Sequence, residues 1–188
     1  MPRGRGRRLE RLLDYAHQLY LNRREADISK KEVATRMDRR TGQMVYLEKT
    51  SFDYSGAIKG GRAIGLEAKE TNGQTRLYVD PKGKSGLKVH QIEGLIRWGK
   101  LGAIAGVAWC LDWDTVLWID WRILEKFMKE LYGKPDKSIK VEWVKQQGCP
   151  EVISDGRLDY LDVVVKDDAM RSVNLGSCSG GQQCLPIK

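Results

Sequence analysis

Hydrophobic positions in the first part of the chain follow the period of an amphipathic helix. Apolar side chains recur every three or four residues from Leu9 to Tyr20, which predicts a helix that ends near residues 22–24. The segment "ADIS" (26–29) then predicts a short strand. Residues 31–50 are mixed and highly charged, too polar for a core element, and we expect them to project from the body. An ordinary surface loop is the alternative.

The middle of the chain alternates between strand-like and helix-like patterns. Each strand-like run is short, and a glycine or a polar turn follows it. The predicted elements are a β-hairpin from strands 52–58 and 63–69 around "KGGR", a strand at 75–79, a helix at 87–98, buried strands at 101–111 and 115–121, and a helix from 121 that closes on Gly133.

The last part of the chain is less regular, and two of its segments predict edge strands. These are "SIKVEWV" (138–144) and "YLDVVVK" (160–166), whereas residues 172–188 are small and polar and predict a mobile tail. Strands interleaved with helices indicate an α/β domain, built on a mixed β-sheet flanked by helices.

Charge changes this picture by suggesting a partner. The net charge is +8, and the first 49 residues hold thirteen Lys and Arg against seven Asp and Glu. A basic end suggests a polyanion, most often nucleic acid, although a solubilising tail has the same composition. The candidate DNA-binding residues are Arg3, Arg5, Arg7, Arg8, Arg36, Arg39 and Arg40.

Apolar runs and cysteines indicate the cellular compartment in which the protein is expected to work. No apolar run reaches about 18 residues and the basic start leads into no uninterrupted apolar segment, so we expect neither a membrane span nor a secretory signal. The four cysteines form no C-x-x-C pair and lie far from both histidines, which argues against a zinc site. Reduced thiols in the cytoplasm are the expectation.

The second strand of the predicted hairpin, "AIGLEAK", carries two charges inside an apolar run. Strand side chains alternate, so Gly65, Glu67 and Lys69 share one face while the apolar residues share the other. Asp53 lies fourteen residues before Glu67, on the first strand. A three-residue loop, Lys59-Gly60-Gly61, would place Asp53 opposite Glu67, whereas a two-residue turn would not.

Two carboxylates on neighbouring strands repel each other unless a cation lies between them. Magnesium takes one or two carboxylates together with water and phosphate oxygens, and a nearby lysine can orient the attacking water. Asp53, Glu67 and Lys69 therefore describe a metal-dependent phosphodiesterase. Taken alone, E-x-K is common in a charged chain, and a solvated strand face is the alternative.

Two further residues are candidates for the same site. Gln91 shares a helix face with Leu87, Leu95 and Trp98, and a buried amide there needs partners. A core glutamine with satisfied hydrogen bonds is the alternative. Glu10 flanks the apolar stripe of the first helix, where it can reach a metal or act as a solvated residue near a helix start.

Three segments together resemble the RecU family of Holliday-junction resolvases. They are "LERLLDYAHQLYLNRREADISKK", "DYSGAIKGGRAIGLEAKET" and "HQIEGL", which occur in the family's order over roughly the first 120 residues. One departure is Phe52, since the family often has a hydroxyl residue directly before the aspartate.

The resemblance implies a restriction-endonuclease-like fold and a homodimer that cuts four-way DNA junctions symmetrically with Mg²⁺, for which Mn²⁺ can substitute. It implies no organic cofactor and no membrane partner. Asp53, Glu67 and Glu10 become metal ligands, Lys69 the catalytic lysine and Gln91 the site glutamine. A stalk that enters the junction corresponds to residues 31–50.

Domain organisation follows from the same resemblance. We expect a flexible basic arm at 1–8, one nuclease domain at 9–171 and a tail at 172–188, in a protein of the cytoplasm of a bacterial or phage-infected cell. Two other functions stay open: a nicking or restriction-type endonuclease of the same fold, and a non-catalytic DNA-binding protein.

Overall fold

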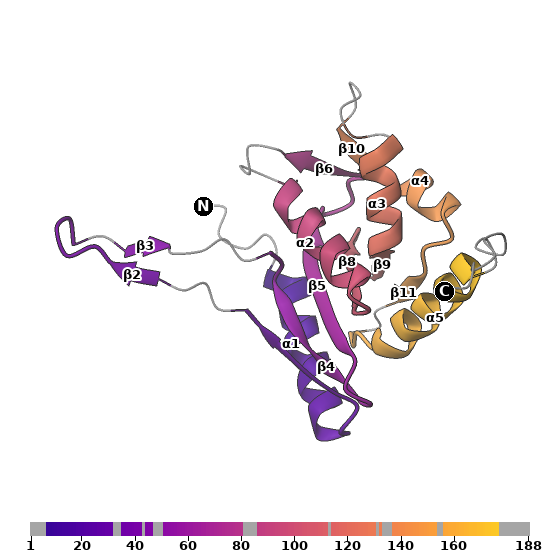
Figure 1. Ribbon diagram of the computed structural model, residues 1–188, viewed down its shortest axis with the longest axis horizontal. Coiled ribbons are helices and arrows are strands. Elements are labelled where there is room, and N and C mark those ends of the chain that lie inside the picture. The colour runs from indigo at the N-terminus through magenta and orange to yellow at the C-terminus, as the bar shows by residue number, and fades with distance from the viewer. Residues whose placement is uncertain are drawn as a thin grey trace, which may run out of the picture.

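A twisted mixed sheet forms the centre of the computed structural model, which describes residues 7–31, 35–42, 44–46, 51–80, 86–112, 114–130, 132, 137–153 and 156–176 (Figure 1). Within these residues the sheet has six strands in the order β1-β4-β5-β8-β9-β11. Their bounds are Ala26–Lys30, Tyr54–Ile58, Ala63–Glu70, Ile104–Cys110, Thr115–Asp120 and Glu151–Ile153. The predicted mixed α/β sheet flanked by helices is therefore confirmed.

The sheet is mixed because β5 and β8 run parallel while their other neighbours in it pair antiparallel. A parallel pair needs a long crossover connection, and α2 (Val89–Lys100) lies within it. Every residue of β8 is buried, because helices cover both faces of the sheet at its centre. This explains why β8 has a continuous apolar sequence where an alternating one is usual.

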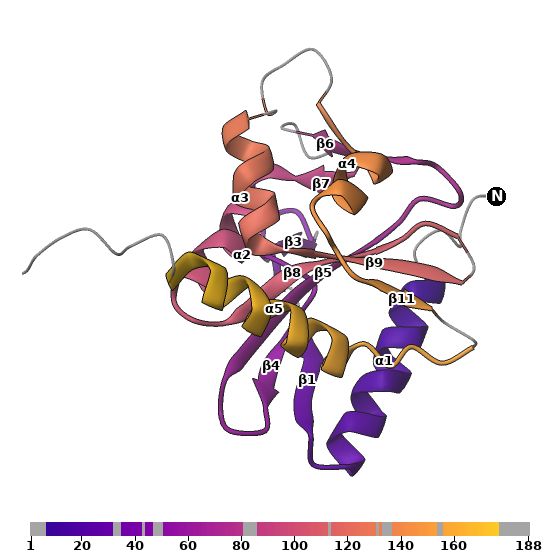
Figure 2. The same cartoon turned by 90° about the vertical axis from the view of Figure 1, so that its right-hand side faces the viewer.

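Helices α1 (Arg7–Asn22) and α5 (Leu161–Gly176) cover one face of the sheet, as Figure 2 shows. Leu13 and Ala16 of α1 and Val164 of α5 pack with Ile64 and Leu66 of β5. Burying a side chain of this size contributes roughly 1.5–3 kcal/mol. The predicted stripe on the first helix is confirmed.

Helix α2, helix α3 (Trp121–Glu130) and a small sheet cover the opposite face. The small sheet joins β10 (Ser138–Lys140), β6 (Arg76–Asp80) and β7 (Leu87–Lys88), and α4 (Val141–Gln146) follows β10. Because these elements form a second core, the face that carries Glu67 is also buried, whereas the sequence had suggested packing on one face only.

The described part of residues 31–50 forms an antiparallel ribbon of β2 (Thr35–Met37) and β3 (Met44–Tyr46). Figure 1 shows this ribbon extending away from the six-stranded sheet. At its tip, Asp38 accepts hydrogen bonds from the backbone N–H of Arg40 and the hydroxyl of Thr41, at 2.9 and 3.0 Å. The tip is therefore a defined turn that carries Arg39 and Arg40.

Several boundaries differ from those predicted. The segment "YLDVVVK" belongs to helix α5 from Leu161 onward, and its three consecutive valines, which suggested a strand, place only Val164 fully in the core. The predicted strand at 75–79 corresponds to β6, which pairs in the small sheet. The predicted edge strand at 138–144 is a strand only over β10 and continues as helix α4. Helix α1 includes Arg7 and α5 reaches Gly176, so residues 7–8 of the expected arm and 172–176 of the expected tail are helical, whereas residues 1–6 and 177–188 lie outside the described residues.

Other sequence expectations concern thiols and membranes. Cys110 and Cys149 are buried free thiols, and burial raises the pKa of each, to about 11 and about 12. Cys178 and Cys184 lie outside the described residues. None of the described helices is long and apolar enough to span a bilayer.

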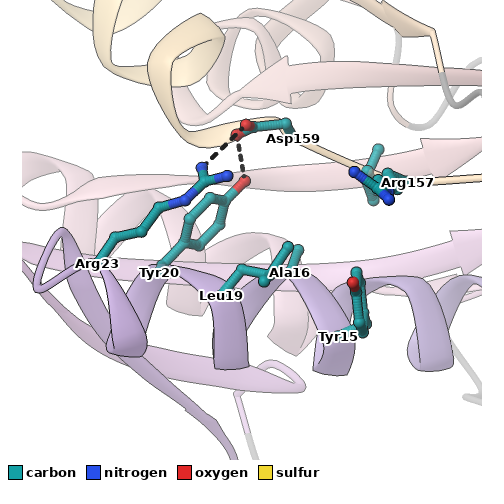
Figure 3. A pocket seen from close by; sticks show the side chains of 8 residues that line it. Tyr15, Ala16, Leu19, Tyr20, Arg23, Arg157 and Asp159 are labelled. Atoms are coloured by element: carbon teal, nitrogen blue, oxygen red, sulfur yellow. Dashed lines mark hydrogen bonds and ion pairs between the residues drawn. The ribbon is translucent and has the colours of Figure 1, made fainter.

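Tyr20 anchors the start of α5 to α1 and gives a test of that packing (Figure 3). Its hydroxyl accepts from the backbone N–H groups of Tyr160 and Leu161 at 2.8 and 3.2 Å and donates to Asp159 at 3.0 Å. Tyr20→Phe leaves two buried donors without a partner, so we expect a loss of about 1–3 kcal/mol in the free energy of unfolding, measured by urea denaturation.

The control for this measurement is Tyr15→Phe on the same helix, because Tyr15 is half exposed. It should leave the free energy of unfolding unchanged. Equal stability of the Tyr20→Phe variant and the wild type would contradict the proposed anchoring of α5.

Candidate active site

The hairpin register decides which side chains meet at the site. Tyr54 pairs with Leu66 and Ser55 with Gly65, and continuing this register places Asp53 opposite Glu67. The turn is the three-residue loop: Ile58 donates to the carbonyl of Arg62, and Gly60 and Gly61 adopt φ of +94° and +83°. The predicted register is therefore confirmed, and glycine suits these two positions because it adopts positive φ without steric cost.

Glu67 is a fully buried carboxylate on β5, facing α2. Its Oε1 accepts hydrogen bonds from Lys69 Nζ at 2.5 Å and from Gln91 Nε2 at 2.6 Å. Lys69 is two residues along the same strand and shares its face, as the alternation predicted. A buried charge is tolerated when it is paired and hydrogen-bonded, and these two donors serve that purpose.

Gln91 holds Glu67 and the start of α2 at once. Its Oε1 accepts from the backbone N–H of Lys88, the residue before the helix, at 3.0 Å, while its Nε2 donates to Glu67. Both ends of the amide therefore have partners, which fixes its orientation. The inward-facing position predicted from helix spacing is confirmed. Gln91 is a buried glutamine with satisfied hydrogen bonds, and one of these bonds is to Glu67 of the site, so both alternatives fit the same geometry.

Asp53 completes the group at the start of β4. Its Oδ2 accepts from the backbone N–H of Ala68 at 3.1 Å, which ties the carboxylate to β5. Burial raises the pKa of Glu67 to about 7, Lys69 opposes that shift, and Asp53 adds to it through its charge and through hydrogen bonding. The pair behaves as two carboxyl groups that share a site and resist carrying two negative charges.

This donor set fits a divalent cation. Glu67 Oε2 is buried and has no hydrogen-bond partner among the described residues, although the other oxygen of the same group has two. A cation bound to this oxygen and to Asp53 would remove the repulsion between the carboxylates. No group of three or more potential metal ligands occurs in the described part of the chain, but magnesium needs only one or two carboxylates.

Glu10 is bound to a lysine. Its Oε2 contacts Lys30 Nζ of β1 at 2.6 Å, and its backbone carbonyl accepts from the Tyr54 hydroxyl at 3.4 Å. Tyr54 also donates to Asp14 at 2.9 Å. Glu10 thus lies on the α1 side of β4 and is held by its own counter-ion, Lys30, on which the charge of Asp53 also acts and helps to raise the pKa.

The predicted DNA-binding arginines are only partly described. Arg3 and Arg5 lie outside the described residues, and of Arg7 and Arg36 only the backbone is described. Arg8 lies in the first turn of α1, and Arg39 and Arg40 are exposed at the tip of the β2–β3 ribbon.

Sequence reasoning missed a second buried ionic group, on the opposite face of the sheet, where α5 packs. Arg122 contacts Asp120 and Asp168 at 3.1 and 3.0 Å, and Arg62 of the β4–β5 loop contacts Asp168 at 2.6 Å. This group clamps α5 to the sheet. The signal was an aspartate inside the apolar run "VLWIDW", which resembles the placement of Glu67.

The arrangement of these groups can support phosphodiester hydrolysis. Two carboxylates on paired strands with an adjacent lysine can hold a metal ion against a phosphate and orient an attacking water. The mixed sheet positions all three groups from the β4–β5 hairpin, and α2 closes over them.

A family model described as "Recombination protein U" (RecU) matches residues 4–166. The chain belongs to this family, and the resemblance seen in the sequence is confirmed. No curated protein sequence matches the chain.

Solved structures that match include Hjc of Archaeoglobus fulgidus, a Holliday junction resolvase from an archaeal hyperthermophile. The two chains are 16% identical with a TM-score of 0.45, and the match covers 75% of this chain and 93% of that one.

The raised pKa of Glu67 predicts how stability depends on pH. Between the unfolded pKa of 4.5 and the folded pKa of about 7, the folded state retains a proton that the unfolded state loses. In metal-free protein, stability therefore falls as pH rises through this interval, by on the order of 3 kcal/mol from this group. Glu67→Gln should flatten that dependence and be the more stable form at pH 8.

Urea unfolding at pH 5, 6, 7 and 8 in the presence of a chelator measures this difference. The outcome that contradicts it is a Glu67→Gln variant whose stability falls with pH as steeply as that of the wild type.

Proposed function

We propose that this member of the RecU family is a Mg²⁺-dependent endonuclease that resolves four-way DNA junctions by symmetric hydrolysis of two phosphodiester bonds. The observation that carries the proposal is the buried Glu67 carboxylate, with Asp53 opposite it and Lys69 in contact with it. A DNA-binding module gains nothing from two repelling carboxylates beneath its surface, whereas a metal-dependent nuclease requires them.

Each residue of the site has a separate task in this proposal. Asp53 and Glu67 hold the cation, Mg²⁺ or Mn²⁺, with Glu10 as a further acidic group. The bound cation supplies Lewis acidity at the scissile phosphate and lowers the pKa of bound water. Lys69 orients the attacking water, and Gln91 fixes the Glu67 carboxylate while leaving Oε2 free for the cation.

The partners follow from the reaction. A four-way junction has two equivalent scissile phosphates, so symmetric cutting calls for a homodimer with two sites related by the same two-fold axis. The β2–β3 ribbon, with Arg39 and Arg40 at its tip, enters the open centre of the junction. The protein acts in the cytoplasm of a bacterial or phage-infected cell, where recombination intermediates form.

Site variants should separate metal binding from catalysis. Asp53→Ala and Glu67→Ala should abolish cleavage and Mg²⁺ binding while leaving DNA binding intact, because removing acidic groups does not weaken the grip on phosphates. Lys69→Ala should also be inactive yet still bind Mg²⁺. Calorimetric titration measures Mg²⁺ binding, and a cleavage assay measures activity. Both are carried out with a four-way junction and with a matched duplex.

Retention of more than a few per cent of activity in both carboxylate variants would contradict the metal-site assignment. Efficient cleavage of the duplex by the wild type would instead favour a nicking or restriction-type enzyme. Failure to cut either DNA would favour a non-catalytic binding protein.

The oligomeric state gives an independent prediction. Light scattering at micromolar concentration should give twice the mass of the 188-residue chain for the protein alone, and that mass plus one junction when junction DNA is added in equimolar amount to the dimer. A monomer under both conditions is inconsistent with symmetric cutting by one enzyme molecule.

The ribbon should make binding selective for junctions. A continuous duplex has no opening for the ribbon, whereas an open junction has a central hole lined by phosphates. Replacing Arg36, Arg39 and Arg40 together by Ala should therefore weaken junction binding more than duplex binding. Each lost phosphate contact should lower the salt slope by roughly 0.9, measured by titration at several salt concentrations.

Deletion of residues 2–6 is the matched control, because it removes two arginines but spares α1, which begins at Arg7. This deletion should weaken binding to junction and duplex alike. Equal losses on both DNAs for the ribbon variant would mean that the ribbon does not read junction structure.

A further inference from the structure

A lysine outside the predicted site lies on two aromatic rings next to it. Lys31 follows the last residue of β1, and its Nζ lies 4.2 Å from the ring centroid of Phe52 and 5.1 Å from that of Trp98. The two rings meet edge to face, with centroids 4.8 Å apart. A lysine over a ring face is attracted by the ring quadrupole, so this contact restricts where the ammonium can lie.

The ring pair beneath Lys31, Phe52 and Trp98, belongs to or packs against the core, so the two rings have little freedom to move. Phe52 is fully buried, and a Cβ added to Gly65 would lie 2.9 Å from its ring and 3.1 Å from that of Trp98. Glycine at this position of β5 therefore makes room for the ring pair.

Lys31 carries no counter-ion within the described residues. Lys30, its neighbour, forms a 2.6 Å ion pair with Glu10, whereas the structure gives Lys31 ring contacts and no carboxylate. Burial lowers the pKa of Lys31, and no carboxylate among the described residues opposes this shift. A partly desolvated ammonium held in place without a counter-ion gains most from an anionic ligand.

The position of Lys31 identifies the anion. Its backbone N–H donates to the carbonyl of Asp53 at 2.7 Å. This hydrogen bond joins the two chain segments on either side of the β2–β3 ribbon, here called its roots, next to the site. Lys30 at the end of β1 pairs with Tyr54 at the start of β4, and Figure 1 shows the β2–β3 ribbon, which lies between these strands in the chain, extending away from the sheet. A DNA strand that runs from the ribbon to the Asp53 and Glu67 carboxylates has to pass these roots.

We propose that Lys31 binds a phosphate of the cleaved strand between the junction centre and the scissile phosphate, and that Phe52 and Trp98 hold its ammonium there. This inference rests on the proposed junction-cleaving function and deepens it. Lys31 is thereby a positioning residue, which sets the distance between the crossover and the cut.

The test compares Lys31→Gln with Lys145→Gln in the full chain, using a four-way junction as the probe. Lys145 is an exposed lysine of α4 that pairs with Glu151, far from the site in the fold. Lys31→Gln should weaken junction binding at low salt and lower the salt slope by roughly 0.9, while Mg²⁺ affinity stays unchanged. Lys145→Gln should match the wild type.

Two further variants separate a phosphate contact from a packing effect. Lys31→Arg keeps the charge and should retain the wild-type salt slope. Phe52→Leu keeps an apolar core residue but removes the ring, so it should shift the cleavage position or weaken binding in the same direction as Lys31→Gln. A salt slope that is unchanged in Lys31→Gln would overturn the inference.

The readouts also distinguish this inference from the proposed function. A wild-type protein that neither binds nor cuts the junction would overturn both. A wild-type protein that cuts the junction, with Lys31→Gln equal to it in salt slope and cleavage position, would overturn only the role of Lys31.

Discussion

The pairing of β4 with β5 is the constraint on which the candidate site depends. Side chains on a strand alternate between faces, so a slip of one residue would turn Asp53 away from Glu67 and towards the α1 side of the sheet. The loop of Lys59, Gly60 and Gly61 prevents that slip, because its positive φ values suit glycine. The local geometry of one turn thereby sets which chemical groups share a pocket.

The fold also has to compensate for a buried charge. Glu67 is fully buried, and Lys69 and Gln91 offset part of the desolvation while Asp53 works against it. Apolar side chains of β8 and α2 enclose the site and leave one carboxylate oxygen without a donor among the described residues, which makes the charged form of Glu67 costly and raises its pKa. A similar buried ionic group at Asp120 and Asp168 has arginine partners. Asp168 Oδ2 also lacks a hydrogen bond among the described residues, but it forms an ion pair with Arg62 at 2.6 Å. The contrast between the two groups separates a site built to receive a ligand from one built to hold elements together.

The sequence was sufficient for elements whose pattern is local. The stripe on α1, the hairpin with its three-residue loop and the inward position of Gln91 all follow from periodicity and turn chemistry. Sequence patterns did not predict the elements whose structure is determined by tertiary contacts. The three valines of α5 favour a strand by propensity, but Tyr20 binds the N–H groups at the start of the helix and Val164 packs on the sheet. The contact of Lys31 with Phe52 and Trp98 joins residues up to 67 positions apart in the sequence, and no local pattern predicts it.

The two hydrogen bonds of Gln91 explain why an amide occupies that position. A glutamate there would accept from Lys88 as well as glutamine does, but it would present a second negative charge to Glu67. A lysine would donate to Glu67 but would leave the Lys88 N–H unsatisfied at the start of α2. Glutamine satisfies one acceptor and one donor with a single neutral side chain. The helix therefore starts at a place fixed by a group in the site, and the orientation of that group is in turn fixed by the helix.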